Sequence, residues 1–239
     1  MIAIVDYDAG NIRSVLNALR RVGAGEVCDL AGPIGNDGII LTADPEQLRA
    51  ASHVILPGVG EASTAMQNLR ERGLADFIPT LTQPVLGICV GAQLMCAGSE
   101  EGDTRCMGIF SAEVRRFKET PQEKVPHMGW NSLREPFASA SDMFALRSKS
   151  EGRCCAAANL SSASATGFSS PLFAGLKQGE YVYFVHSYYP EVCDNTIAVT
   201  NHGIDFSAAL NKDNFFACQF HPEKSGTAGE QILKNFLAL

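Results

Sequence analysis

Short, continuous apolar runs alternate with amphipathic segments over the first 110 residues, and this alternation constrains the fold more than any other feature. The apolar runs cover 2–5, 38–41, 52–56 and 84–89, and the segments between them with helical spacing cover 11–23, 44–51 and 62–73. Continuous apolar strands are typical of parallel sheets buried on both faces, which need helical crossovers. The sequence therefore predicts an α/β fold, a doubly wound and mostly parallel sheet flanked by helices.

Further signals refine this prediction. Asp44 fits a helix N-cap, with Pro45 at the first helical position and Gln47 closing a capping box. Additional antiparallel strands are expected in the second half, at 113–117, 181–189, 196–202 and 215–220. A closing helix follows, beginning with a Thr227/Glu230 capping box. Residues 1–239 are expected to form a single domain, and a stretch rich in Ser and Ala at about 138–170 is expected to be a surface insertion.

Composition excludes several classes of protein. The formal net charge of -7 argues against a general nucleic-acid binder, which needs a basic face. Apolar stretches are too short for a membrane span, and the first apolar run is too short for a signal peptide. The eight cysteines lack framework spacing and any C-x-x-C pair, so we expect reduced thiols in the cytoplasm and neither a metal nor a cofactor.

The strongest chemical signal is Gly87-Ile88-Cys89-Val90-Gly91, where a buried strand meets a helix. A sharp turn there would project Cys89 as a nucleophile, and the glycines on either side leave room for the turn. The N–H of Val90 would point to a developing oxyanion, and the helix terminus would favour the thiolate. Taken alone, the pattern fits equally well a core cysteine flanked by glycines.

A base and its orienting group follow at Phe220-His221-Pro222-Glu223, with His221 placed 132 positions after Cys89. In extended chain, residues two apart face the same side, so Glu223 can hold the His221 ring. By itself this segment would more often be a surface turn. Pro57-Gly58-Val59-Gly60 follows another buried strand and could offer a second N–H to an oxyanion, although in isolation a plain strand-to-helix turn is the preferred explanation.

Together these motifs resemble the triad-type (class I) glutamine amidotransferases, whose fold is flavodoxin-like. Within that family the chain is similar to the glutaminase subunits of imidazole glycerol phosphate synthase. Further stretches that carry the likeness are Asp8-Ala9-Gly10-Asn11, Lys124-Val125-Pro126-His127-Met128-Gly129-Trp130-Asn131 and Tyr183-Phe184-Val185-His186-Ser187-Tyr188-Tyr189. Two features depart from the family pattern, namely Glu61-Ala62-Ser63 after the glycine turn and the length of 138–170.

The resemblance implies a role for each residue. Cys89 would attack the glutamine amide and form a thioester, with His221 as general acid and base and Glu223 as its orienter. Val90 together with Gly58 or Val59 would form the oxyanion hole. The residues that would contact glutamine are Gly60, Gln93, His186, Ser187 and Tyr188.

The resemblance also implies a partner. Ammonia would pass to a cyclase subunit, a (β/α)8 barrel that forms a heterodimer with this chain and makes imidazole glycerol phosphate in histidine biosynthesis. The residues that would form the interface and ammonia gate are Asn11, Pro126, His127, Met128, Gly129, Trp130 and Tyr183. Three alternatives stay open, namely the glutaminase of another biosynthetic assembly, a stand-alone cysteine hydrolase and a binding module without activity.

Overall fold

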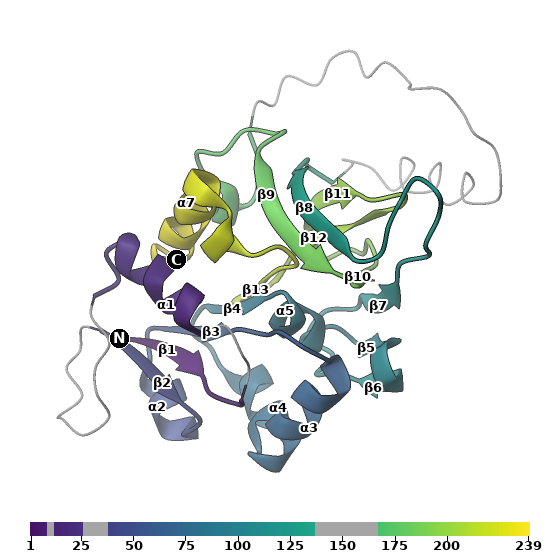
Figure 1. Ribbon diagram of the computed structural model, residues 1–239. Helices are drawn as coiled ribbons and strands as arrows, with labels where there is room; N and C mark the ends of the chain where they lie inside the picture. The colour runs from purple at the N-terminus through teal and green to yellow at the C-terminus, as the bar shows by residue number, and fades with distance from the viewer. Residues whose placement is uncertain (9–11, 26–37, 137–166) are drawn as a thin grey trace.

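The computed structural model describes residues 1–8, 12–25, 38–136 and 167–239 (Figure 1). Most of the expected insertion, including Cys154 and Cys155, lies outside these ranges, and so does Asn11. The helices are α1 (Ile12–Arg21), α2 (Pro45–Ala50), α3 (Ala62–Glu71), α4 (Leu74–Phe77), α5 (Val90–Leu94) and α7 (Gly226–Leu237). The strands are β1 (Ile2–Val5), β2 (Ile39–Thr42), β3 (His53–Leu56), β4 (Val85–Ile88), β5 (Gly98–Ser99), β6 (Thr104–Arg105), β7 (Glu113–Arg116), β8 (His127–Ser132), β9 (Tyr181–His186), β10 (Tyr188–Pro190), β11 (Thr196–Asn201), β12 (Asp205–Lys212) and β13 (Phe215–Cys218).

A seven-stranded sheet forms the centre, in the order β11-β12-β13-β4-β3-β1-β2. From β13 to β2 the neighbours are parallel, and β12 and β11 extend the sheet by antiparallel pairing. Strands β1 and β4 are buried at every position, as continuous apolar runs predict. The predicted mostly parallel sheet with additional antiparallel strands is confirmed.

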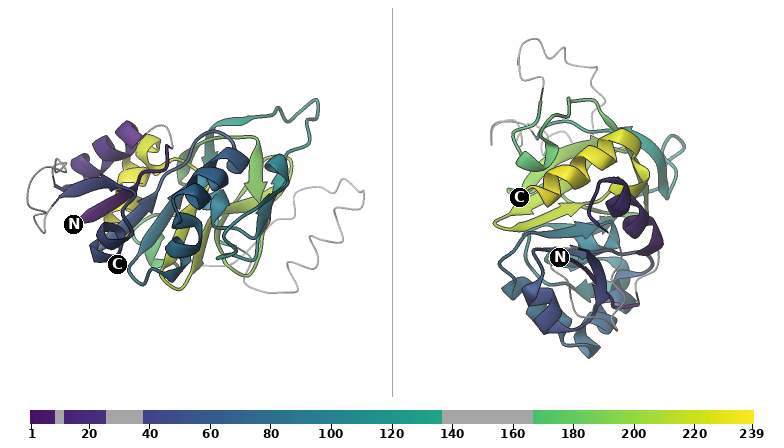
Figure 2. Two further views of the ribbon diagram at one scale, coloured as in Figure 1. Left: turned by 90° about the horizontal axis from the view of Figure 1, so that it is seen from below. Right: turned by 90° about the vertical axis from the view of Figure 1, so that its left-hand side faces the viewer.

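Helices cover both faces of this sheet. In Figure 1, α1 and α7 lie together on one side of it, and α2, α3 and α4 lie on the other. The right-hand view of Figure 2 also shows α1 beside α7, although the two are far apart in sequence. Helix α1 turns Val15, Ala18 and Leu19 toward the core, at the spacing of one amphipathic face.

Two smaller sheets complete the described fold, one of order β10-β7-β5-β6 and one a ribbon of β8 and β9. The prediction of one strand over 181–189 is wrong, because the chain breaks between β9 and β10 at Ser187. Strand β12 was not predicted, since polar residues interrupt its apolar pattern. One of them, Ser207, is fully buried and hydrogen-bonds to Thr196 Oγ1 (2.7 Å) and to the carbonyl of Glu191 (2.8 Å).

Only part of the predicted capping occurs. Asp44 caps α2 by accepting a hydrogen bond from the N–H of Glu46 at 2.9 Å, but Gln47 Oε1 has no hydrogen-bond partner. Helix α7 begins at Gly226, so Thr227 lies inside it, and Glu230 instead pairs with Arg21 on α1 at 3.0 Å. Both capping-box predictions are therefore wrong, because the Asp44 N–H donates to Thr42 Oγ1 instead and α7 begins before Thr227.

The parallel strands determine where chemistry is possible. The carboxyl ends of β1, β3, β4 and β13 meet at one edge of the sheet, where ligands bind in open α/β folds. Cys89 follows β4 at this edge. His221 comes soon after β13, the strand that pairs directly with β4. Of the helices within the described ranges, none combines the length and apolar character required to cross a bilayer.

Candidate active site

Cys89 lies in the turn between β4 and α5, with a positive φ of 54°. Few residues other than glycine adopt this conformation, and it marks a strained turn at a functional position. The Cys89 N–H donates to the carbonyl of Cys218 at 2.8 Å, which ties the turn to the end of β13. The side chain is 4% exposed and Sγ lies 4.0 Å from the carbonyl oxygen of Val185. The predicted elbow is thus present in the backbone.

Two glycines allow the backbone after β3 to lie directly against the elbow. A β-carbon at Gly91 would come within 2.0 Å of the Leu56 carbonyl oxygen, and one at Gly58 within 2.2 Å of the Gly91 nitrogen. Such contacts are far inside van der Waals range, so these positions cannot accept a side chain without movement. The packing brings the Pro57–Gly60 turn beside the first N–H groups of α5.

Substituting Gly91 should therefore destabilise the chain. We expect Gly91→Ala to lower the free energy of unfolding by about 3 kcal/mol, because the added methyl group overpacks a backbone contact. Gly167→Ala is a matched control, since a β-carbon there would meet its nearest neighbour at an ordinary 3.6 Å. Urea unfolding of the two variants measures the difference. Equal stability of the variants would contradict the close packing described above.

His221 and Glu223 lie on the turn after β13, which continues as the 3₁₀ helix Pro222–Lys224. His221 Nδ1 is 2.8 Å from Glu223 Oε1, and both side chains are nearly fully buried. Burial lowers the pKa of His221, but hydrogen bonds to Cys89 and Glu223 and the charges of both groups outweigh it and raise the pKa to about 9. The arrangement thus supports an imidazolium between a thiolate and a carboxylate.

The turn Pro57–Gly60 lies at the mouth of the site. Gly58 is buried, whereas Val59 is 37% exposed and Gly60 has a positive φ of 93°. A small cavity beside the turn is lined by Val15, Pro57, Gly58, Val59, Ile88, His221 and Glu223. The Tyr7 hydroxyl donates a short hydrogen bond to the Pro57 carbonyl and anchors the turn. Sequence reasoning missed Tyr7, although its position directly after β1 and Asp6 places it at this edge of the sheet.

Gln93 and Tyr188, both predicted to contact glutamine, are joined to each other. Gln93 Nε2 donates to the carbonyl of Tyr188 and to Oε1 of Gln219, both at 2.8 Å. Because both protons of this amide are engaged, Gln93 could bond to a substrate only by accepting a hydrogen bond at its Oε1. Gly60 lies at the exposed end of the glycine turn, and Ser187 occupies the break between β9 and β10.

His186, a predicted glutamine contact, and His127, a predicted interface residue, form a buried pair. His186 Nδ1 donates to the Tyr188 carbonyl at 2.8 Å, so its Nε2 accepts from His127 Nδ1 at 3.0 Å. Asn131 Nδ2 lies 3.2 Å from the remaining nitrogen of His127. Burial lowers the pKa of His186 to about 3, and burial and the nearby His202 lower that of His127 to about 4. Each ring is therefore neutral near pH 7.

This pair predicts sensitivity to acid. Below pH 6.5 the unfolded chain takes up protons on these histidines that the folded chain does not, so stability falls as the pH drops toward about 4 and 3. His186 contributes up to about 1.4 kcal/mol per pH unit in this window. Urea unfolding at pH 7 and pH 5 should show a smaller loss for His186→Asn than for the wild type. An equal loss in both proteins would contradict the prediction.

The ribbon of β8 and β9 presents an apolar face to solvent. Met128 and Trp130 on β8 are 64% and 55% exposed, and Trp130 pairs in register with Tyr183 on β9. The Trp130 and Tyr183 rings meet edge to face at 6.0 Å, and Lys224 Nζ lies 5.9 Å from the Tyr183 ring centroid. Pro126 is exposed next to this face and Gly129 lies within β8 at a φ of 133°.

Sequence reasoning missed Tyr181 on this face and Lys224 beside it. Lys224 belongs to the quoted F-H-P-E-K-S-G motif, and Tyr181 lies two positions before Tyr183 and is 59% exposed. Exposed aromatic and apolar side chains gathered on one ribbon are typical of a protein interface. The opposite side of the ribbon is buried, and there Val182, Phe184 and His186 join the core.

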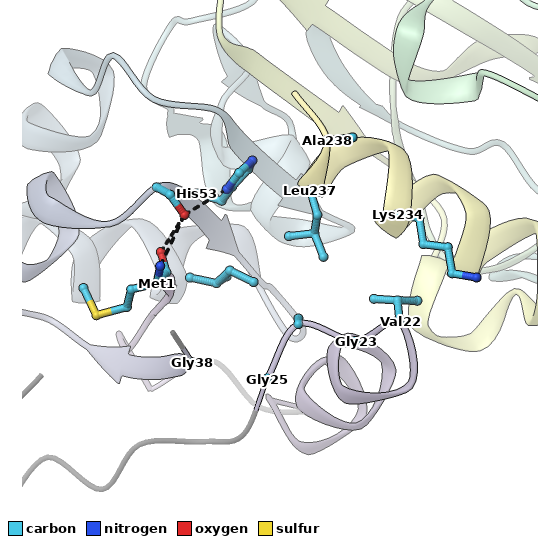
Figure 3. A pocket seen from close by; sticks show the side chains of 12 residues that line it. Met1, Val22, Gly23, Gly25, Gly38, His53, Lys234, Leu237 and Ala238 are labelled. Atoms are coloured by element: carbon cyan, nitrogen blue, oxygen red, sulfur yellow. Dashed lines mark hydrogen bonds between the residues drawn. The ribbon is translucent and has the colours of Figure 1, made fainter. Parts of the chain in front are cut away.

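A separate pocket of about 470 Å³ opens at the other edge of the sheet (Figure 3). It is lined by residues from the starts of β1 and β3 and the end of α7, among them Met1, His53 and Leu237. Cys89, His221 and Glu223 lie at the opposite edge, so the pocket is distinct from the candidate site. The chain between its rim residues Gly25 and Gly38 lies outside the described ranges.

Comparison with known proteins identifies the family of this chain. Residues 3–239 match the family described as glutamine amidotransferase class-I. Relatives named imidazole glycerol phosphate synthase subunit HisH include those of Bacteroides fragilis (47% identical, covering 100% of this chain and 99% of the relative) and Shewanella oneidensis (37% identical, covering 100% and 96%). A crystal structure of a glutamine amidotransferase shares the fold, with a TM-score of 0.62 and 17% identity over 100% of this chain and 98% of that one. The chain belongs to the class-I glutamine amidotransferase family.

Proposed function

We propose that this chain is the glutaminase subunit of an imidazole glycerol phosphate synthase and hydrolyses glutamine to glutamate and ammonia. One observation carries the proposal, namely the Cys89 elbow on β4 beside the buried His221–Glu223 pair on the adjacent strand. The full-length relatives named as subunits of that synthase support the choice of pathway. The five described cysteines are all free, as a protein of the reducing cytoplasm requires.

In the proposed reaction, the Cys89 thiolate attacks the side-chain carbonyl carbon of glutamine. The tetrahedral intermediate then expels ammonia, which takes its proton from the His221 imidazolium, and a γ-glutamyl thioester remains. Neutral His221 next accepts a proton from water, the resulting hydroxide attacks the thioester, and glutamate leaves as Cys89 regains its starting state. Glu223 holds the imidazole through Nδ1, so that Nε2 faces the reacting groups.

The N–H of Val90 and one from Gly58 or Val59 would bind the oxyanion of both intermediates. Gly91 and Gly58 place these two segments in direct backbone contact, which holds donors from both sides close to Cys89. For glutamine itself we retain the contacts Gly60, Gln93, His186, Ser187 and Tyr188. Both ring nitrogens of His186 bond within the protein, so His186 would bind glutamine through its backbone groups and not through its ring.

We further propose that the ammonia passes to a cyclase subunit, a (β/α)8 barrel, without release to water. The apolar face of Met128, Trp130, Tyr181 and Tyr183 is the surface that this partner would cover. The same ribbon reaches the nucleophile, since the Val185 carbonyl on β9 contacts Cys89 Sγ. Lys224 next to Tyr183 joins the proposed gate.

Ammonia release from glutamine tests the proposal. We expect negligible turnover by the purified chain alone and strong stimulation by the cyclase of the same organism together with its ribulosyl-phosphate substrate. Trp130→Ala should weaken this stimulation, and Leu239→Ala, an exposed apolar side chain just after α7 at the other edge of the sheet, is the matched control. Brisk turnover by the chain alone, indifferent to the cyclase, would instead identify a stand-alone hydrolase or a subunit of another assembly.

A further inference from the structure

Gln219 contacts the nucleophile but has no part in the mechanism above. It follows β13 directly, two positions before His221, and its backbone N–H donates to the carbonyl of Ala208 at 2.9 Å. The side chain is 1% exposed, and its Nε2 lies 3.8 Å from Cys89 Sγ, a hydrogen-bond distance for the large sulfur atom. A buried amide aimed at a reactive sulfur needs a chemical explanation.

The direction of this amide follows from its neighbours. The Tyr188 carbonyl can only accept hydrogen bonds, so the atom of Gln93 that faces it at 2.8 Å must be the NH₂ group. The same NH₂ group faces Gln219 at 2.8 Å, which must therefore present its oxygen. The NH₂ group of Gln219 is then turned toward Cys89. His186 Nδ1 donates to the same Tyr188 carbonyl. This bond holds the carbonyl at which the series of hydrogen bonds through Gln93 and Gln219 begins.

An N–H donor at the sulfur favours one protonation state over the other. A thiolate is a strong acceptor and a thiol a weak one, so the Gln219 amide stabilises the charged form more than the neutral form. Hydrogen bonds to a charged group are about twice as strong as neutral ones, and burial strengthens them further. Gln219 thus acts on the same sulfur as His221 but without exchanging a proton.

We propose that Gln219 is a further catalytic residue, which donates an amide hydrogen bond to the Cys89 sulfur and stabilises the attacking thiolate. Gln93 is then a positioning residue, because its amide fixes the direction in which Gln219 points. This inference rests on the proposed glutaminase function, since it concerns the same nucleophile.

The test is the pH dependence of Cys89 alkylation by iodoacetamide, followed on the Cys89 peptide by mass spectrometry because the chain has eight cysteines. Gln219→Glu keeps the side chain's shape and the oxygen that accepts from Gln93, but replaces the donor at the sulfur by an acceptor. Gln219→Met keeps the volume and removes both polar atoms. Gln231→Glu is the matched control, because Gln231 bonds to Asn235 on α7, far from the sulfur.

We expect the midpoint of the alkylation profile to move to higher pH by about 1 to 2 units in both Gln219 variants, with no shift in the control. The glutaminase kcat of the activated complex should fall about 10- to 100-fold in Gln219→Met, with KM nearly unchanged. Gln93→Met, which frees the Gln219 amide to rotate, should shift the midpoint in the same direction by less. An unchanged midpoint in a folded Gln219 variant would overturn the inference.

These outcomes separate the inference from the proposed function. If wild-type Cys89 is alkylated readily and the complex hydrolyses glutamine, but the Gln219 variants behave like the wild type, only the role of Gln219 is wrong. If the wild-type complex hydrolyses no glutamine, the proposed function itself fails. If Gln219→Met does not fold, Gln219→Glu and Gln93→Met still decide the question.

Discussion

Replacing Cys89 by serine should lower glutamine hydrolysis by at least about 10⁴-fold, because loss of the nucleophile in a triad removes most of the catalysis. The serine occupies the same strained turn and keeps the hydrogen bond of the backbone N–H to the Cys218 carbonyl. The substitution therefore changes the chemistry and not the fold. Glutamate formation by the complex with its cyclase, measured at saturating glutamine, checks the loss.

The partner reaction provides the control for this variant. The complex that carries Cys89→Ser should still make imidazole glycerol phosphate when ammonium salt replaces glutamine, since that step does not use the thiol. Circular dichroism shows whether the variant is folded. If a folded variant complex lost the ammonia-driven reaction as well, the proposed division of labour between the two subunits would be incorrect.

Glu223→Gln should lower kcat by about 10³- to 10⁴-fold with little change in structure. Glu223 accepts a hydrogen bond from His221 Nδ1 at 2.8 Å, so the proton of the neutral ring lies on Nδ1 and Nε2 is free to accept. Gln can turn its NH₂ group toward Nδ1, which reverses the tautomer and places a proton on Nε2. The variant also removes a charge that stabilises the imidazolium.

Stability at high pH gives a second measurement on the same variant. The folded-state pKa of His221, about 9, lies above the ordinary value of 6.5, so its contribution is complete below pH 6.5 and is lost as the pH rises through 9. Because Glu223 is one cause of the raised pKa, Glu223→Gln should lose less stability than the wild type between pH 6.5 and 9.5. Asp205→Asn, which alters an ion pair with Arg134 outside the site, is a control. A loss equal to that of the wild type would contradict the coupling of His221 to Glu223.

The parallel half of the fold could be predicted from sequence because its signals are local. Apolar runs such as 2–5 are buried on both faces, and Gly23 and Gly73 end α1 and α3 at their predicted places. The adjacency of Cys89 and His221 also follows from the sequence once both are placed after parallel strands, since the carboxyl ends of such strands share an edge.

What the sequence did not reveal depends on tertiary partners. Strand β12 is interrupted by polar residues such as Ser207, whose hydrogen-bond partners are Thr196 on β11 and the Glu191 carbonyl, so no local period marks the strand. Gln219 has a role only because Gln93, distant in sequence, determines which end of its amide faces the sulfur. The pairing of His127 with His186 likewise depends on the register of β8 against β9.

The position of β13 also determines when during synthesis the chain can become active. β13 lies between β4 and β12 in the sheet but comes after all other strands in the chain, so the edge of β4 has no neighbour on that side until nearly the whole protein has left the ribosome. An open strand edge of this kind pairs readily with other chains. Insertion of β13 closes that edge and at the same moment brings His221 to Cys89. A nascent chain that still risks aggregation therefore holds an incomplete glutaminase site, and the complete site exists only once the sheet is closed.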